Sequence, residues 1–395
     1  MRNGVLNINK PEGITSFDVV AGIKRVAKVK KIGHTGTLDP DASGVLLICL
    51  GQATKIVPFL METTKEYRAT LRLGITTDTL DASGTVLERT EGFDFSEEQV
   101  REVMDSFVGE IEQIPPMFSA LRHQGKRLYE LAREGVEVER KPREIQIYHL
   151  TMQHYAPPYV TFDVSCSKGT YIRTLCADIG QKLGVGGHMS SLQRVRVGEM
   201  TIEQAIPFEA ITRITVSEIL ATSLHSLDDV LKFLPVVRIA SETERKVYHG
   251  VPLLPRDVVK CPENFRKGDL FRGHNMNNRL LGIFEALTDV TGITDITDIT
   301  GMTGITGNNG ITGIIGINGI NDVNGINDAA GVTSITGITG ITDPEIADNH
   351  QAEQQGEELW FKTKRLLVDP PSGARSKDRG KEEQHRIPAT DGNDE

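Results

Sequence analysis

Cysteine is scarce in this chain of 395 residues, and no long hydrophobic run occurs. The cysteines show no C-x-x-C pair or other metal-ligand spacing, which argues against a zinc-binding or disulfide-stabilised protein. They are Cys49, Cys166, Cys176 and Cys261. No apolar stretch approaches the roughly 20 residues of a membrane-spanning helix, and the first residues lack an apolar signal segment. We therefore expect a soluble, cytoplasmic protein with reduced thiols, no membrane contact and no metal.

Positive net charge is also missing, since the chain carries −10 at pH 7. The imbalance is local: residues 1–200 hold 25 Lys+Arg and 25 Asp+Glu, whereas residues 289–356 hold nine acids and no Lys or Arg. Two basic stretches stand out in the neutral part, KRVAKVKK (24–31) and RHQGKRLYELAR (122–133). Each fits either a contact with nucleic-acid phosphates or a solvated helix face.

The acidic region repeats a Thr/Asn-Gly/Asp-Ile triplet over about 288–356. A period of three fits neither a strand nor an amphipathic helix, so we interpret the repeat as a mobile, low-complexity insertion. The runs RLLGIFEAL and ELWFKTKRLLV flank it and should pair as strands if the repeat is a loop between them. We expect a first domain over 1–230, a small β-rich domain over 231–369 that contains the insertion, and a disordered charged tail over 370–395.

Two segments of the first domain show clear local patterns. SEEQVREVMDSFVGE begins with a capping box, Ser96 with Gln99, and predicts an amphipathic helix that stops at Gly109. VTFDVSCSKGTYIRTLCADIGQKLG predicts a half-buried strand, a glycine turn and a helix that ends at Gly184. Arg173 would then lie in the first turn of that helix, aimed at the edge of a cleft.

The stretch KIGHTGTLDPDASG contains one acid directly before a proline. A residue before proline is pushed towards extended geometry, so Asp39 should project from a loop. Gly33 and Gly36 allow a ligand to approach the backbone. An alternative role as a cap for the following element does not account for these glycines or for His34.

The letters DPDAS also fit the D-x-D-x-[ST] pattern of aspartyl phosphatases, in which the first aspartate attacks phosphorus. That pattern should follow a buried hydrophobic strand. Here KIGHTGTL precedes it, which is polar and rich in glycine. The phosphatase interpretation is therefore the weaker one.

Six segments resemble, in order and spacing, the motifs of the bacterial tRNA pseudouridine synthase B family and cover roughly residues 3–200. They are GVLNINKPEGITSFDVV, KIGHTGTLDPDASGVLLICLGQATKI, KEYRATLRLGITTDTLDASG, GEIEQIPPMFSALRHQGKRLYELAREG, CSKGTYIRTLCADIG and SLQRVRVG. The resemblance implies an α+β fold with a mixed, mostly antiparallel central sheet. It also implies a small C-terminal PUA-like RNA-binding domain, which the triplet repeat would interrupt.

The family resemblance implies an enzyme that isomerises uridine to pseudouridine at position 55 in the T-loop of tRNA. The expected partner is the tRNA T-arm, and the expected state is a monomer. No cofactor is expected, because the isomerisation involves no redox change and no net gain of atoms. The target base is stacked inside a folded loop, so the enzyme must flip it out. A non-catalytic module that binds or folds RNA remains the alternative.

Three catalytic residues follow from the resemblance. Asp39 is expected to be the nucleophile, which adds to the uracil ring or to the sugar carbon. Arg173 is expected to pair with it and to lower its pKa. Tyr67 is expected to stack on the uracil and to take part in a late proton transfer.

The same resemblance implies a set of binding residues. His34 is expected to contact the flipped nucleotide, whereas Tyr171 and Leu192 are expected to line the uracil pocket. A basic and aromatic group suits an RNA-binding surface; it consists of Lys126, Arg127 and Tyr129.

Overall fold

The computed structural model describes residues 3–213, 222–291 and 359–368. Most of the predicted insertion and the whole predicted tail lie outside these residues. The chain divides into two compact units, Met1–Phe233 and Leu234–Glu395, which are described separately. None of the helices in the described part combines the length and the apolar composition of a bilayer span.

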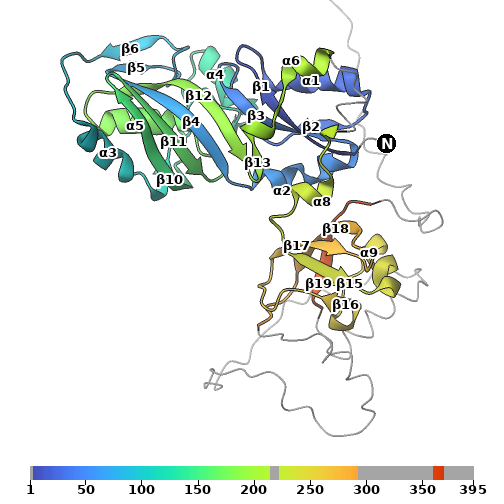
Figure 1. Ribbon diagram of the computed structural model, residues 1–395. Coiled ribbons are helices and arrows are strands. Elements are labelled where there is room, and N and C mark those ends of the chain that lie inside the picture. Colours follow the sequence, from blue (N-terminus) through green and yellow to red (C-terminus); the bar gives the residue numbers. More distant parts are fainter. Residues whose placement is uncertain (1–2, 214–221, 292–358, 369–395) are drawn as a thin grey trace, which may run out of the picture. The chain divides into compact units, whose positions relative to one another are not determined.

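Unit 1 is built on a mixed sheet of ten strands (Figure 1). Along its main path the strands are β14 (Ile206–Pro207), β1 (Gly4–Lys10), β3 (Ser43–Leu50), β12 (Gly187–Val197), β4 (Lys65–Leu73), β11 (Tyr159–Cys166), β10 (Arg143–Ala156) and β7 (Gly109–Gln113). Two short strands join it at the side, β2 (Ile32–His34) on β3 and β13 (Met200–Thr201) on β12. The pairs β1–β14 and β3–β12 are parallel and the others antiparallel. The predicted α+β class with a mostly antiparallel sheet is confirmed.

Helices and two small hairpins complete unit 1. The helices are α1 (Ser16–Ala27), α2 (Val57–Met61), α3 (Glu97–Asp105), α4 (Leu128–Arg133), α5 (Ile172–Lys182), α6 (Phe208–Arg213) and α8 (Leu227–Val230), with 3-10 turns η1 (Gly51–Ile56) and η2 (Ile202–Gln204). The hairpins are β5 (Ile75–Thr77) with β6 (Val86–Arg89), and β8 (Arg122–His123) with β9 (Lys126–Arg127). One core lies among β4, β10, β11, β12, α3 and α5, and a second lies where α1 and α6 pack on β1 and β3.

The local predictions for unit 1 hold in part: the helix that was predicted to stop at Gly109 is α3, which ends at Asp105, and Gly109 begins strand β7. Ser96 caps α3 through a capping box with Gln99. The strand predicted before the glycine turn is β11, and the helix after the turn is α5, which ends at Lys182, two residues before Gly184. Asp39 lies in a loop, as predicted, whereas Ile32–His34 of the stretch before it pair with β3 as the short strand β2.

Unit 2 contains a five-stranded sheet in the order β16-β15-β17-β18-β19. Its elements are β15 (Val236–Ile239), η3 (Ser241–Thr243), α9 (Glu244–His249), η4 (Pro255–Asp257), β16 (Val258–Lys260), β17 (Leu270–His274), β18 (Leu280–Ala286) and β19 (Phe361–Leu366). Its core is aromatic, with Phe265 in contact with Phe271, Trp360 and Phe361. The two runs that flank the repeat pair as antiparallel β18 and β19, as predicted. The backbone of Val290 pairs with that of Phe265, so the described structure of unit 2 continues into the first residues of the predicted insertion.

Candidate active site

Asp39 lies on a loop between β2 and β3 that is fastened to helix α1. Ser16, the first residue of α1, donates from its hydroxyl to the Leu38 carbonyl at 3.1 Å and accepts from the Leu38 amide at 2.9 Å. The Pro40 carbonyl accepts from the Gly13 amide at 2.9 Å. Both neighbours of Asp39 in the chain are therefore held by the segment that opens α1.

A buried lysine provides a further tie. The Lys10 ammonium donates to the carbonyls of Pro11, Ile14 and Pro40, at 2.9, 2.7 and 3.1 Å. Burial lowers the pKa of Lys10 to about 8, and the negative charge of Asp39 opposes that shift. Lys10 therefore brings a positive charge beneath the loop while its three donors hold the backbone.

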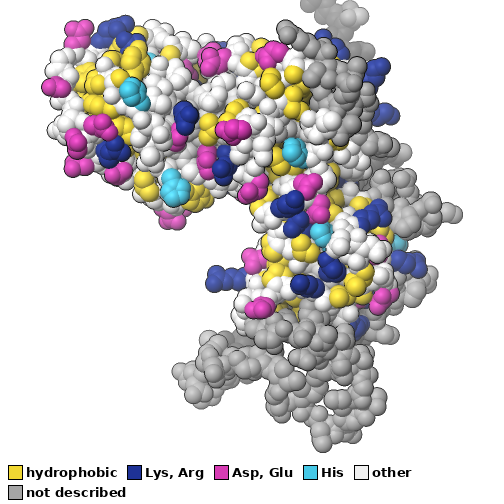
Figure 2. Space-filling view, viewed as in Figure 1, with side chains coloured by type: hydrophobic (Ala, Val, Ile, Leu, Met, Phe, Trp, Pro, Cys, Tyr) yellow, Lys and Arg dark blue, Asp and Glu magenta, His cyan; other side chains and the backbone are white. Residues whose placement is uncertain are grey.

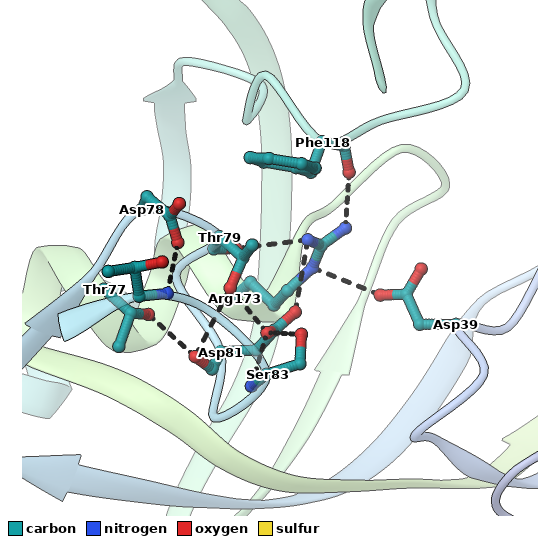
Figure 3. A network of polar contacts seen from close by, with 9 residues as sticks. Asp39, Thr77, Asp78, Thr79, Asp81, Ser83, Phe118 and Arg173 are labelled. Atoms are coloured by element: carbon teal, nitrogen blue, oxygen red, sulfur yellow. Dashed lines mark hydrogen bonds and ion pairs between the residues drawn. The ribbon is translucent and has the colours of Figure 1, made fainter. Parts of the chain in front are cut away.

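Arg173 pairs with Asp39 as predicted. It lies in the first turn of α5, and its Nε is 3.1 Å from Asp39 Oδ2. Its remaining nitrogens donate to the carbonyls of Thr79 and Phe118, at 3.1 and 2.8 Å (Figure 3). The arginine side chain is 8% exposed and that of Asp39 is 41% exposed. A buried, fixed guanidinium thus presents one edge to a carboxylate that is only partly exposed.

A second carboxylate, that of Asp81, completes this network (Figure 3). Its Oδ2 lies 3.3 Å from Arg173 Nη1, whereas Oδ1 accepts from the hydroxyls of Thr79 and Ser83, each at 2.6 Å. These contacts hold the Asp81 side chain in the turn between β5 and β6. Asp81 therefore helps to position Arg173. The planar guanidinium suits this arrangement, because its separate edges meet separate oxygens.

The pKa of Asp39 is raised above its ordinary value. Burial is the main cause; Arg173 opposes it, and the negative charges of Asp81 and Asp41 add to it. The expected lowering effect of Arg173 on the pKa of Asp39 is therefore present, and burial outweighs it. The arginine is needed to keep the carboxylate available as an anion, because its surroundings favour the protonated form.

Tyr67 lies in β4 and packs against the larger core of unit 1. Burial raises the pKa of its phenol, while the charge of Arg194 and a hydrogen bond from Arg194 oppose the shift. Arg194 is itself buried in β12, where Nε donates to the Val45 carbonyl at 2.7 Å and Nη2 to the Gly36 carbonyl at 3.2 Å. One arginine therefore connects the tyrosine, strand β3 and the loop that carries Asp39.

A pocket of about 260 Å³ opens beside Asp39. Asp39, Asp81 and Leu192 contribute to its lining, and Leu192 is 8% exposed. Tyr171 adjoins the site from the chain position before α5: its amide donates to Gln113 at 2.7 Å, and its carbonyl accepts from the same side chain at 3.0 Å. A flat, partly apolar ring would meet the anionic carboxylate at the edge of this pocket.

His34 ends β2, five residues before Asp39. Its Nδ1 accepts from the Gly36 amide at 3.3 Å. Burial lowers the pKa of His34, so the imidazole is neutral at pH 7. The histidine thus supports the turn that leads into the loop.

The predicted RNA-contact group lies on the β8–β9 hairpin and α4. Lys126 pairs with Glu134 at 3.1 Å, and the guanidinium groups of Arg127 and Arg133 lie 6.0 and 5.5 Å from the centre of the Tyr129 ring. These side chains are not among those that gather around Asp39. The segment before the hairpin contacts the site through the Phe118 carbonyl, which accepts from Arg173.

Comparison with known proteins decides the family. A model of the N-terminal domain of TruB family pseudouridylate synthases matches residues 24–172, and one of the tRNA pseudouridylate synthase B C-terminal domain matches residues 173–235. The tRNA pseudouridine synthase B of Clostridium perfringens is 44% identical over 282 residues, which are 71% of this chain and 94% of that protein. This chain belongs to the TruB family. The TruB protein of Clostridium tetani is 54% identical over 225 residues, which cover 57% of this chain and 78% of that protein.

Solved structures extend the TruB likeness to more distant proteins. A crystal structure of a Cbf5-Nop10-Gar1 complex matches with a TM-score of 0.58 and 30% identity, over 74% of this chain and 80% of that one. A structure of an H/ACA RNP bound to a substrate RNA containing 2'-deoxyuridine matches with a TM-score of 0.57 and 29% identity, over 72% and 78%. Unit 1 therefore carries the pseudouridine synthase fold.

TruB membership overturns the phosphatase alternative. Within residues 3–213, 222–291 and 359–368, no group of three or more His, Cys, Asp or Glu side chains is arranged to hold a metal ion.

The sequence analysis did not single out Asp81 or Arg194, although both lie within motifs that resemble those of the TruB family. The only local signal for Asp81 was its place in the short polar run DTLDASG.

Proposed function

We propose that this chain converts uridine to pseudouridine at position 55 in the T-loop of tRNA, with Asp39 as the nucleophile. Membership of the TruB family makes it a tRNA pseudouridine synthase; the position, the flipped base and the role of Asp39 are the proposal. The observation that carries it is the Asp39–Arg173 ion pair of 3.1 Å at the edge of a pocket of about 260 Å³. This arrangement provides an anionic nucleophile and, beside it, space for a planar ring.

The reaction needs a base that has left its stack. Extrusion costs a few kcal/mol of unstacking, which contacts of the flipped nucleotide with the pocket must offset. Leu192 lines the pocket, and it is proposed to make these contacts together with His34 and Tyr171. The hairpin residues Lys126 and Arg127, with the Tyr129 ring, are proposed to hold the RNA beside the site.

The bond changes follow from the chemistry of isomerisation. The Asp39 carboxylate adds to the uracil ring or to C1′, and the bond from C1′ to N1 breaks. The uracil turns within the pocket, its C5 bonds to C1′, and the carboxylate leaves. The proton on C5 departs last and N1 gains a proton, so that the atoms balance. We propose that the Tyr67 hydroxyl, which Arg194 contacts, takes part in that transfer.

Unit 2 is proposed to act as a small RNA-binding domain of the PUA type. What supports this is its compact five-stranded sheet with an aromatic core. The proposed enzyme acts as a monomer on the T-arm.

The test is the substitution Asp39→Asn, which keeps the size of the side chain and removes its negative charge. Pseudouridine formation should fall to background, because the neutral amide is not a nucleophile, while tRNA affinity stays within about tenfold, or 1.4 kcal/mol. Single-turnover assays and mapping of pseudouridine in the tRNA product measure the first quantity, and titration with tRNA measures the second.

Asp41→Asn is the matched control, since Asp41 lines the same pocket two residues further along the chain. Its turnover should persist. Substantial turnover by Asp39→Asn would remove Asp39 from the role of nucleophile, and wild-type protein that binds tRNA without forming pseudouridine would favour the non-catalytic alternative.

A further inference from the structure

The outer face of α1 exposes an aromatic ring close to the site. Val19, Ile23 and Ala27 turn inward and pack against the core on β1 and β3. Phe17 points the other way and is 74% exposed, more than any other large hydrophobic side chain in the described part of the chain. Folding therefore leaves this ring almost entirely in water.

Basic side chains follow the ring along the same helix and along the segment that connects it to β2. They are Lys24, Arg25, Lys28, Lys30 and Lys31, and all of them are exposed. Within the residues that the structure describes, none of these five cations is part of an ion pair. The only acid between Gly13 and Leu38 is Asp18, whose carboxylate caps Thr15. The segment is thus strongly cationic in a chain whose net charge is −10.

The Phe17 ring and two of the five cations share one hollow of about 500 Å³ between α1 and β2. Phe17, Lys24, Arg25 and Ile32 contribute to its lining. Figure 2 shows dark blue and yellow side chains together over this end of unit 1. The exposed aromatic and the positive charge therefore form one surface, called here the α1 face.

The α1 face adjoins the loop that carries Asp39 on both sides of the hollow. On one side Ser16, directly before Phe17, is hydrogen-bonded to Leu38. On the other side β2 runs from Ile32 to His34. A polymer that lies in the hollow would consequently extend from the edge of the active site.

We propose that the α1 face is a second RNA-binding surface, which holds the phosphate backbone of a part of the substrate outside the loop with the target uridine, with one base stacked on Phe17. This inference rests on the proposed function, because it takes the RNA to be the substrate of the Asp39 site. The twelve residues of α1 span about 18 Å, which is long enough to follow several phosphates of one strand. Lysine and arginine neutralise phosphates, and an exposed aromatic ring stacks on a base of any sequence.

A second copy of the chain fits this surface less well. A symmetric dimer contact would place the same patch on both sides of the interface, so that five cations would face five. A polyanion meets the charges without such repulsion.

The double substitution Lys24→Gln/Lys28→Gln tests the charged part, with affinity for full-length tRNA and for a short target stem-loop measured over a series of salt concentrations. If each lysine neutralises one phosphate, the slope of log K against log salt should decrease by about 1.4 to 1.8. The loss should appear in Kd and KM rather than in the rate at saturation, and it should be larger for tRNA than for the stem-loop. Phe17→Ala should lower affinity about fivefold or more with the salt slope unchanged.

Arg89→Gln/Arg101→Gln is the charge-matched control, since both residues are exposed on β6 and α3, at the other end of unit 1 (Figure 1). Leu87→Ala, which removes a side chain that is 64% exposed on β6, matches Phe17→Ala. An unchanged slope in the lysine variant, or one that changes equally in the control, would overturn the proposal. So would a change in sedimentation without a change in RNA affinity, which would indicate a protein interface. Wild-type protein that fails to form pseudouridine contradicts the proposed function, whereas the binding slopes still decide the α1 face.

Discussion

At the scale of single residues, the site depends on one guanidinium that serves two carboxylates. Arg173 meets Asp39 at 3.1 Å and Asp81 at 3.3 Å. Burial raises the pKa of Asp39 while Arg173 opposes it, so the ionised fraction of the nucleophile reflects the balance of the two. The reaction needs the anion, and the rate should therefore fall as the pH falls through the pKa of Asp39.

Substitution of Arg173 should move this acid limb. In Arg173→Met the opposing charge is lost, the pKa of Asp39 rises further, and the acid limb should shift upward by about one pH unit or more. The acid limb of Arg173→Lys should lie between those of this variant and the wild type. Its rate should be lower at every pH, because an ammonium group cannot bond to separate oxygens as the planar guanidinium does. Single-turnover rates at saturating enzyme between pH 5 and pH 9 measure both effects.

Arg68→Met supplies the control for this series. Arg68 forms an exposed pair with Asp163 at 2.8 Å and lies outside the site. Its pH profile should match that of the wild type. An acid limb at the same pH in all the variants would mean that Arg173 does not hold Asp39 ionised.

At the scale of elements, the parallel contact between β3 and β12 positions the catalytic loop. Gly44 lies opposite Arg194 in this contact and has a φ of +111°. A Cβ at this position would lie 2.2 Å from the Arg194 carbonyl oxygen. The close approach lets the Arg194 side chain reach the carbonyls of Val45 and Gly36, and only glycine permits it.

Gly44→Ala should therefore weaken the fold as well as the site. We expect a loss of at least about 2 kcal/mol in the free energy of unfolding, from backbone strain and overpacking together. Denaturant titration measures it. Gly33→Ala is the control, since its Cβ would meet only Val57 Cγ2, at 4.0 Å; an equal loss in both variants would contradict the role assigned to the close contact.

The features that could be predicted from the sequence are those that depend on residues close together in the chain. Helix α5, strand β11 and the position of Arg173 were predictable, because alternation, a glycine turn and helical spacing are written in adjacent residues. Asp81 and Arg194 were not singled out, because their contacts join residues that are far apart in the sequence. Asp81 contacts Arg173, 92 residues away, and Arg194 contacts Val45, 149 residues away. That burial outweighs Arg173 in its effect on the Asp39 pKa could not be read from the sequence either, because burial is a property of the assembled fold.

At the scale of the whole molecule, the described residues on the two sides of 292–358 are hydrogen-bonded neighbours in unit 2. β18 and β19 are adjacent strands, and the Leu287 amide donates to the Trp360 carbonyl at 2.8 Å. Residues 292–358 connect them and hold ten Asp and Glu but no Lys or Arg. These acids equal the net charge of the whole chain, −10.

Replacing residues 292–358 by a short Gly/Asn turn should leave pseudouridine formation intact. Both flanking strands keep their partners, and each halving of a flexible loop changes its closure cost by only about 0.6 kcal/mol. Removal of the acids should also tighten tRNA binding at low salt, where repulsion is least screened. Activity, thermal unfolding and tRNA affinity of the shortened chain test this, and a variant that folds yet is inactive would make the segment a working part of the enzyme.

The ties on the catalytic loop also bear on the entropy of the reaction. Gly36 to Asp41 are six residues, and their backbone is held by Arg194, Ser16 and Lys10. Ordering a residue costs about 1–2 kcal/mol, so a loop that had to become ordered around each RNA would cost on the order of 10 kcal/mol per encounter. Because these contacts form when the protein folds, that entropy is lost once in the lifetime of the molecule, and the binding energy of each RNA remains available to unstack its base and orient it.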